Sequence, residues 1–290
     1  MYFRAFHGVP ESVVAPDGTP VNAVRGFLDA VARLVVDYRP TRLVAAFDAD
    51  WRPQWRVDLL PSYKAHRVAV DGDEEVPDLL TPQVPVIEAV LDALGLARVG
   101  VPGFEADDVL GTVAVGAGCP VDVVTGDRDL FQLVDDHRGI RVLYTGKGFA
   151  KLDKVDESWV QAKYGVAASR YVDFATLRGD PSDGLPGVPG VGDKTAAAIV
   201  SAVGGVDEVL AALDDPDAEL PARAKLAVAR DYLRVAPTVV RVRHDVPLPP
   251  LVDRLPAVPR DPAALQELVT TWGLGRSVDR LLVSLAAAAA

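Results

Sequence analysis

The sequence contains very little of the residues that build disulfides, zinc centres and membrane spans. It has one cysteine and four histidines among 290 residues, which excludes an internal disulfide framework and leaves a Cys/His zinc centre without ligands. The longest apolar stretch near the C-terminus, residues 281–290 with Ser284 inside, is shorter than the about 20 residues that a transmembrane helix needs. Because a signal-peptide pattern is lacking too, we expect a cytoplasmic protein whose terminal alanines form a frayed tail.

Net positive charge is lacking as well. Thirty lysines and arginines are set against 41 aspartates and glutamates, so the formal charge is -11 at pH 7, which by itself argues against a nucleic-acid partner. One segment nevertheless concentrates basic and aromatic residues: Trp51, Arg52, Trp55, Arg56, Tyr63, Lys64 and Arg67. Trp51 and Trp55 are four residues apart, and a shared buried helical face and a stacking role on single-stranded DNA remain equally open for them.

What the chain does have is a series of acidic clusters. Glu105, Asp107 and Asp108 lie within four consecutive positions, before an apolar run that is typical of a helix. Crowded carboxylates repel and raise one another's pKa, so such a cluster either spreads into solvent or is neutralised by a metal ion. Taken alone, this segment favours the structural interpretation, because acids in a first helical turn also suit the helix dipole.

The same pattern recurs at other predicted element ends, and the recurrence favours metal binding. Asp48 follows an apolar strand candidate at 43–47, Asp127 and Asp129 follow a β-branched run at 121–125, and Asp180 and Asp183 frame a Gly-Asp-Pro-Ser-Asp-Gly turn. Ligands gather at the carboxyl ends of strands in α/β sheets, although Asp129 alone would serve equally well as a helix N-cap. Eight carboxylates without a Cys/His cluster predict two oxygen-preferring ions, Mg²⁺ or Mn²⁺. With these eight neutralised, the remaining formal charge is -3.

Strand and helix patterns alternate in the first half of the sequence. The expected elements are a helix at 21–35, a strand at 43–47, a helix at 84–94, the helix after Glu105, and strands at 121–125 and 141–144. This alternation predicts an α/β core, residues 1–158, with a parallel twisted sheet covered by helices on both faces. Residues 51–85 interrupt it with polar, proline- and charge-rich sequence, including 71–75, which is typical of a lid or binding loop.

From about Trp159 onward the sequence predicts an all-helical subdomain, residues 159–290. Its expected helices are 159–164, 171–177, 193–203, 206–213 and 222–235. Within it, Gly187-Val-Pro-Gly-Val-Gly-Asp-Lys-Thr195 is typical of a glycine hairpin that opens a helix. Glycines allow close approach of a phosphate, and the helix N-terminus with Lys194 supplies donors and charge, which favours phosphate binding over an ordinary turn. The candidate contacts are Gly190, Gly192, Lys194 and Thr195.

Five ordered motifs resemble those of bacterial 5′-3′ exonucleases. They are Phe47-Asp-Ala, Ser62-Tyr-Lys-Ala-His-Arg67, Gly103-Phe-Glu-Ala-Asp-Asp108, Thr125-Gly-Asp-Arg-Asp-Leu-Phe-Gln132 and Gly179-Asp-Pro-Ser-Asp-Gly-Leu-Pro-Gly-Val-Pro-Gly-Val-Gly-Asp-Lys-Thr195, and the similarity runs from Tyr2 to about Leu248. The chain is similar to the 5′-nuclease domain of DNA polymerase I and its free-standing relatives in the flap endonuclease superfamily. The resemblance implies a PIN-like core with a helical arch near 51–85 and a helix-three-turn-helix subdomain with a helix-hairpin-helix at 187–203. It also implies metal-dependent hydrolysis of DNA at 5′ ends, nicks or 5′ flaps in replication and repair.

The resemblance further implies roles for single residues. Lys64 and Arg67 would meet the scissile phosphate from the arch, where Lys64 would stabilise developing negative charge. The carboxylates divide into a first metal group, Asp48, Glu105, Asp107 and Asp108, and a second, Asp127, Asp129, Asp180 and Asp183. Other expected DNA contacts are Tyr2, Arg4, Arg52 and Arg56. The carbonyls of Gly187, Val188 and Val191 would hold a K⁺ ion shared with a DNA phosphate, and a DNA polymerase and a ligase would be functional partners.

Two departures from the family pattern matter. Gly184 stands where the family usually has Asn, which removes an amide that could hold the turn but removes no metal ligand. The segment from Tyr2 to Phe6 matches one that in the family follows an apolar strand ending in an aspartate, so we expect that strand and ligand to fall before Met1. The alternative to a nuclease is therefore a structure-selective DNA-binding protein with weakened catalysis. An RNA-directed nuclease fits the hairpin and the Lys64 segment less well.

Overall fold

The computed structural model describes residues 1–69, 72 and 74–289; part of the acidic run predicted at 71–75 lies outside the described residues. The first half of the chain is an α/β region. Its helices are α1 (Tyr2–Gly8), α2 (Asn22–Tyr38), α3 (Gln54–Leu59), α4 (Gln83–Leu94) and α5 (Ala106–Gly116), with short 3-10 turns η1 (Ala65–Arg67) and η2 (Asp129–Leu133). Its strands are β1 (Val44–Ala46), β2 (Ala97–Val99), β3 (Val121–Thr125), β4 (Ile140–Tyr144) and β5 (Asp153–Val155).

The strands form two separate sheets in the described part of the chain. β1 pairs in parallel with β2, in the register Val44 to Ala97, and β3 pairs in parallel with β4, in the register Val121 to Ile140. Parallel pairing is confirmed for the two predicted strands β3 and β4, whereas β1 pairs with β2, which was not predicted, and the described strands form two sheets instead of the one expected. β5, which was not predicted, adds an antiparallel edge to β4. β1 and β3 each have one strand neighbour, so one backbone edge of each is left without a ladder.

A cavity of about 1450 Å³ touches both sheets. Apolar side chains of α2, β1, α5 and β3 line it, among them Val31, Val44, Val113 and Val123, and its other end reaches the acidic residues at the ends of β1 and β3. The expectation of a strand and an aspartate ahead of Met1 stays a prediction.

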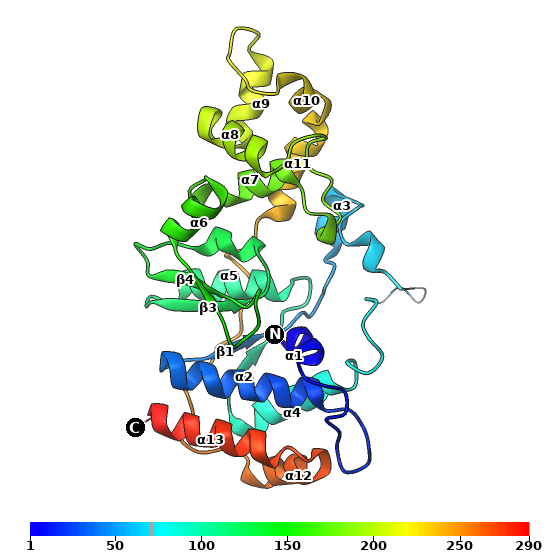
Figure 1. Cartoon of the computed structure of the whole chain (residues 1–290), viewed down its shortest axis with the longest axis vertical. Coiled ribbons are helices and arrows are strands. Elements are labelled where there is room, and N and C mark those ends of the chain that lie inside the picture. Colours follow the sequence, from blue (N-terminus) through cyan, green and yellow to red (C-terminus); the bar gives the residue numbers. More distant parts are fainter. Residues whose placement is uncertain (70–71, 73, 290) are drawn as a thin grey trace.

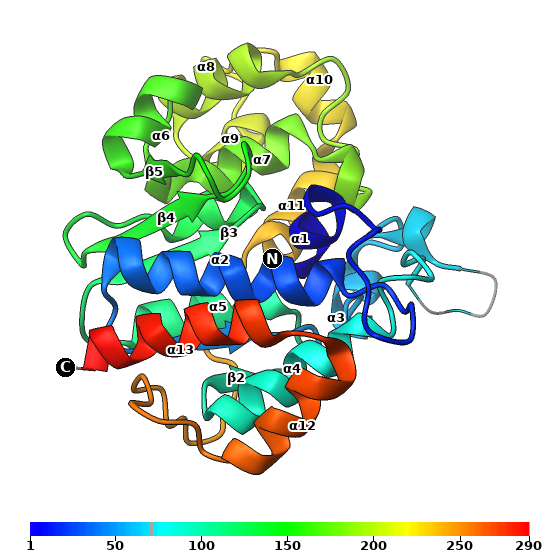
Figure 2. The same ribbon diagram turned by 60° about the horizontal axis from the view of Figure 1, so that its bottom comes forward.

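The C-terminal helices complete the α/β region. α12 (Pro262–Trp272) packs on α4, and α13 (Gly275–Ala289) packs along α2, as Figures 1 and 2 show. Leu281 and Leu285 of α13 are buried in the same core as Val24 and Phe27 of α2. Because α13 continues to Ala289, the prediction of a frayed alanine tail is wrong. The domain bounds stay a prediction, although α12 and α13 pack on helices of the first half of the chain. The apolar spacing of the leucines, rather than the alanines, gives α13 its buried face.

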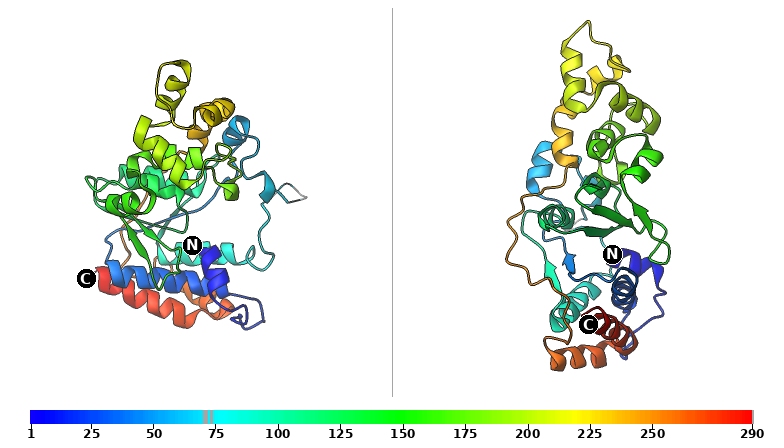
Figure 3. Two further views of the ribbon diagram at one scale, coloured as in Figure 1. Left: turned by 45° about the horizontal axis from the view of Figure 1, so that its top comes forward. Right: turned by 90° about the vertical axis from the view of Figure 1, so that its left-hand side faces the viewer.

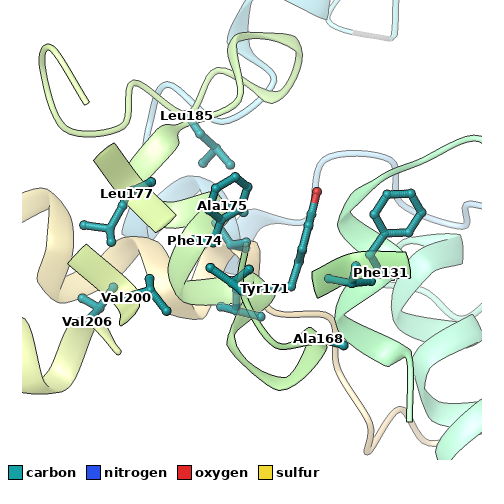
Figure 4. Packing of buried hydrophobic residues seen from close by; sticks show 14 of the residues in the cluster. Phe131, Ala168, Tyr171, Phe174, Ala175, Leu177, Leu185, Val200 and Val206 are labelled. Carbon is teal, nitrogen blue, oxygen red and sulfur yellow. The ribbon is translucent and has the colours of Figure 1, made fainter. Parts of the chain in front are cut away.

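The helical region lies above the strands in both views of Figure 3. It consists of α6 (Glu157–Tyr164), η3 (Ala168–Arg170), α7 (Tyr171–Arg178), η4 (Pro181–Asp183), α8 (Asp193–Val203), α9 (Val206–Asp214), α10 (Arg223–Val228) and α11 (Arg230–Val240). The predicted helix at 222–235 is split between α10 and α11. Tyr171 and Phe174 of α7 pack with Phe131 of η2 (Figure 4), which joins this core to the end of β3.

Among the described helices, none is by itself both long and apolar enough to cross a bilayer; the bent pair α8 and α9 meets the length and composition criteria only when taken together.

Candidate active site

The ends of β1 and β3 and the start of α5 bring the acidic residues of the first half together. Asp48 follows β1, and its Oδ1 accepts a hydrogen bond of 2.8 Å from the backbone N–H of Ala106, the first residue of α5. Asp127 follows β3, and its Oδ1 accepts a hydrogen bond of 2.8 Å from the Asp129 N–H. The charges of Asp48 and Asp127 both act on the Asp107 carboxyl, so the two turns lie close together.

The carboxyl of Asp107 is surrounded by the negative charges of other carboxyls. Burial raises its pKa well above the ordinary value, and the charges of Asp127, Asp48 and Glu105 raise it further. A carboxyl surrounded by others in this way ionises fully only when a cation comes close. Asp48, Asp107 and Asp127 therefore belong to one electrostatic group, whereas the sequence analysis assigned Asp127 to the second metal group; which ion each residue would hold stays a prediction.

Asp129, Asp180 and Asp183 form the neighbouring acidic group. Asp129 is 8% exposed, and within the described chain its Oδ1 is a buried oxygen without a hydrogen-bond partner. Burial raises the pKa of Asp129 well above its usual value, and Asp127, Asp183 and Asp180 add to the shift. Burial likewise raises the pKa of Asp183. An unpartnered buried oxygen among like charges is a suitable ligand for a cation.

The donor set fits a hard divalent ion, although its members do not yet form a closed shell. In the described residues, no three His, Cys, Asp and Glu side chains converge closely enough to hold one ion as they stand. All of the candidate ligands are carboxylates, which suits Mg²⁺ or Mn²⁺ rather than zinc. Binding would therefore require side chains to draw together around the ion.

Asp108 and Arg56 form a buried ion pair. Asp108 is fully buried and Arg56 is 2% exposed. The guanidinium donates two hydrogen bonds to the Asp108 carboxylate, at 2.7 and 2.8 Å, and Oδ1 also accepts from the Arg243 N–H at 2.9 Å. Both oxygens of Asp108 are therefore engaged. This buried pairing favours a structural role for both residues; Asp108 as a metal ligand and Arg56 as a DNA contact stay predictions.

Arg56 also joins separate parts of the chain. Its Nε donates to the Val239 carbonyl at 3.0 Å, and its Nη1 contacts Glu105. Buried charges need such complete pairing, because an uncompensated one is costly. Sequence spacing gave no indication of this contact, since its partners lie 49 to 183 residues away.

Lys64 lies between the two acidic groups. Its Nζ is ion-paired with Glu105 and donates to the Trp51 carbonyl at 3.3 Å, while its backbone N–H donates to the Asp183 carbonyl at 2.9 Å. Burial opposes the charge, but Glu105 and Asp183 outweigh it and raise the Lys64 pKa above its usual value. The residue has a left-handed backbone, with φ of 47°. A charged donor is thus held where both groups of carboxylates meet.

Arg67 is bound to the turn that carries Asp183. Its Nη2 donates to Asp183 Oδ1 at 2.7 Å and to the Ser182 carbonyl at 2.6 Å. Ser62 Oγ donates to the Gly184 carbonyl at 2.7 Å. Gly184 has a φ of 71°, and a Cβ there would overlap the Ser62 carbonyl oxygen. The close approach of the two segments therefore explains glycine at this position, and two backbone hydrogen bonds between Asp180 and Leu185 hold the turn.

Several predicted DNA contacts are engaged within the protein. Tyr2 stacks on Phe47 with 6.2 Å between ring centroids, Arg4 donates to the Gly126 carbonyl at 3.3 Å, and Arg52 donates to the Tyr63 carbonyl at 2.6 Å. Trp55 donates to the Gly103 carbonyl at 3.2 Å and lies against Arg56, which favours the structural interpretation of that residue. Contact of Tyr2, Arg4 and Arg52 with DNA stays a prediction.

The glycine hairpin forms as predicted and opens α8. Gly187 and Gly190 have φ values of 66° and 72°, and Gly192 precedes the helix with open space around its Cα. Lys194 is exposed in the first turn of α8, with Thr195 partly buried beside it. Lys225, which the sequence analysis missed, donates to the Gly190 carbonyl at 2.7 Å. The Val188 carbonyl accepts from the Val191 N–H at 3.0 Å; a K⁺ ion at Gly187, Val188 and Val191 stays a prediction.

Two more basic residues missed by the sequence analysis lie beside Asp180. Arg128 and Arg178 each place a guanidinium nitrogen within 4 Å of its carboxylate. The signal was present in the sequence, because each arginine is within two positions of a predicted ligand, in Gly-Asp-Arg-Asp and Arg-Gly-Asp.

Comparison with known families places the chain among nucleases. Residues 1–165 match the family model described as "5'-3' exonuclease, N-terminal resolvase-like domain", and residues 166–263 match "5'-3' exonuclease, C-terminal SAM fold". A 5'-3' exonuclease of Streptomyces coelicolor is 62% identical, over 99% of this chain and 98% of its own length. One of Mycobacterium tuberculosis is 52% identical, over 97% and 93%. DNA polymerase I of M. tuberculosis is 40% identical over 99% of this chain, which spans 31% of the polymerase.

Solved structures share the fold. The T5 D15 protein, co-crystallised with metal ions, matches with a TM-score of 0.61 and 15% identity, covering 92% of this chain and 91% of that one. The catalytic core of Rad2 in complex with DNA substrate matches with a TM-score of 0.60 and 18% identity, covering 98% and 88%. The predicted α/β core with a helical C-terminal region is confirmed.

Proposed function

Because the chain belongs to the 5′-3′ exonuclease family, we propose that it hydrolyses DNA phosphodiesters at 5′ ends and at the base of 5′ flaps, with two divalent cations. The observation that carries the proposal is the position of Lys64. Its side chain is paired with Glu105 of one acidic group, and its backbone is bonded to Asp183 of the other. A phosphate that meets both groups would meet this ammonium as well.

The site residues divide the work between them. Asp48, Glu105, Asp107 and Asp127 would hold one Mg²⁺ or Mn²⁺ ion, and Asp129, Asp180 and Asp183 the other, with Asp127 between the two sets. Bound ions would supply a water acidic enough to attack at neutral pH and would neutralise charge on the phosphate. Lys64 and Arg67 would stabilise negative charge that develops on the phosphate in the transition state.

The hairpin before α8 would hold duplex DNA away from the reacting phosphate. Gly190, Gly192, Lys194 and Thr195 offer backbone N–H groups, a hydroxyl and a cation, and a K⁺ ion at the Gly187, Val188 and Val191 carbonyls would add to them. Contacts to phosphates position DNA without reading its sequence. The substrate would therefore be chosen by its structure. A cytoplasmic location and cooperation with a DNA polymerase and a ligase belong to the same proposal, supported by the identity with DNA polymerase I.

The deciding experiment is single-turnover cleavage of a 5′-labelled flap duplex in Mg²⁺, with an RNA flap and a blunt duplex in parallel. We expect cleavage at the flap base and release of short products from a recessed 5′ end. Asp107→Ala should abolish cleavage but still bind the flap in Ca²⁺. Binding without cleavage by the wild-type chain, even in high Mg²⁺, would instead support the DNA-binding alternative.

A further inference from the structure

Arg178, the last residue of α7, is a buried cation directed at the second acidic group. Its side chain is 11% exposed, and its Nη2 lies 3.6 Å from Asp180 Oδ2. Nη2 is also one of the buried polar atoms that find no hydrogen-bond partner within the described residues. The other end of the guanidinium is anchored, because Nε donates to the Gly179 carbonyl at 3.0 Å and the group lies 5.2 Å above the Phe174 ring.

The carboxylates opposite Arg178 are left with free oxygens. Asp129 Oδ1 is buried without a partner, and the charge of Arg178 lowers the Asp129 pKa against the larger opposing effect of burial. At 3.6 Å, the guanidinium neutralises Asp180 without forming a hydrogen bond to it. Asp180 Oδ1 accepts hydrogen bonds from the Ser182 N–H and Oγ–H. The arginine thus offsets negative charge in the group but leaves Asp129 Oδ1 and Asp180 Oδ2 available as ligands.

We propose that Arg178 is a positioning residue that sets the affinity of the second divalent-cation site, and that its fixed charge weakens binding of the ion there. The inference rests on the proposed function. A buried positive charge repels an incoming cation with little screening by water. Without that charge, Asp129 and Asp180 would repel each other more in the free protein and would bind the ion more tightly.

Arg128 provides a matched control. Its Nη2 lies 3.7 Å from the same Asp180 oxygen, but its side chain is 48% exposed. Removing either arginine deletes one positive charge at nearly the same distance. Because exposed charges are screened by solvent, Arg128→Met should affect the ion less than Arg178→Met. Arg178 also acts on Asp129 and lies 4.0 Å from Asp193 Oδ1.

The test measures Mn²⁺ binding to the full chain, without DNA, by isothermal titration calorimetry. Arg178→Met should lower the larger of the two Mn²⁺ dissociation constants by about ten-fold or more. Arg178→Lys and Arg128→Met should change the same constant by less than about three-fold. The metal-free melting temperature of Arg178→Met should fall, and saturating Mn²⁺ should close most of the gap. Flap cleavage should then reach half its maximal rate at a lower Mn²⁺ concentration.

Unchanged or weaker Mn²⁺ binding by Arg178→Met would overturn the inference, as would an equal gain in Arg128→Met. If Arg178→Met is unfolded without metal, Arg178→Gln, which keeps a donor for the Gly179 carbonyl, carries the same expectation. Variants that stay unfolded in saturating Mn²⁺ would show that the guanidinium serves only the fold, which also overturns it. A wild-type chain that binds no Mn²⁺ would contradict the proposed function instead, so the two failures are distinguishable.

Discussion

Lys64 and Lys194 are both basic residues of predicted function, but the structure holds them very differently. Lys64 is largely buried among carboxylates, whereas Lys194 is exposed at the start of α8. Lys64→Ala should lower the single-turnover cleavage rate by about 10²–10³-fold, as is typical for loss of one donor to a transition-state charge. Lys194→Ala should mainly weaken duplex binding and reduce its salt dependence by about one unit of slope. Fluorescence anisotropy in Ca²⁺ and rapid-quench cleavage in Mg²⁺ separate the two, and a reversed pattern would reject both assignments.

Asp107 and Asp108 are neighbours whose isosteric substitutions should have opposite effects on stability. Burial raises the pKa of Asp107 in the folded protein well above the ordinary value of 3.8. At a pH between the ordinary and the raised pKa, the folded state binds a proton that the unfolded state has released. The free energy of unfolding therefore falls as pH rises through this window. Asp107→Asn removes the cost of ionising a buried carboxyl. At pH 7 without divalent ions it should therefore raise the free energy of unfolding by about 1 kcal/mol or more, and it should abolish cleavage. Below pH 3.8 the gain should disappear.

Asp108→Asn is the control for that measurement. It leaves the buried Arg56 guanidinium with a neutral partner in place of a bidentate carboxylate, so it should lower the free energy of unfolding at pH 7 by about 3 kcal/mol. Urea unfolding in EDTA measures both variants. A stabilised Asp108→Asn, or a destabilised Asp107→Asn, would contradict the division of these residues into structural and functional ones.

At the scale of elements, α13 shows where sequence patterns misled. Because α13 ends in a run of alanines, its apolar helical face was not recognised in the sequence. Leu281 is fully buried against α2, whereas Val283, two residues later, is 71% exposed. Leu281→Ala should lower the free energy of unfolding by about 2–5 kcal/mol, as buried leucines usually do. Val283→Ala should change it by less than about 0.5 kcal/mol. Equal effects in thermal unfolding would show that α13 is not docked in solution.

Elements with a clear local pattern were easier to predict than those that depend on tertiary pairing. Residues 121–125 were predicted as a strand and form β3, because a β-branched run between turn signals has few other solutions. β2 and β5, of three residues each, were missed because they depend on pairing that sequence alone does not reveal, whereas β1, equally short, lies in an apolar run. The division at 222–235 was missed because Ala229, where α10 ends, carries no turn signal.

At the scale of the whole molecule, the sequence identified which residue types gather at the site but not which ones pair. The carboxylates were found because strand and helix ends can be located from local patterns. The ion pair of Arg56 was not foreseen because its partners lie at the start of α5 and at the end of α11, far away in sequence. Burial decides between a DNA contact and a structural ion pair, and burial is a property of the assembled chain.

The division of the strands into two sheets should also be visible in isotope exchange. β3 has β4 as its one strand neighbour among the described residues, whereas β4 is paired on both sides. Alternate amides of β3 therefore have no ladder acceptor, and unbonded amides exchange without waiting for the structure to open. In deuterium-exchange mass spectrometry, peptides covering residues 121–125 should take up part of their label within seconds, while those covering 140–144 stay protected. Equal protection of both strands would mean that something in solution occupies the open edge of β3.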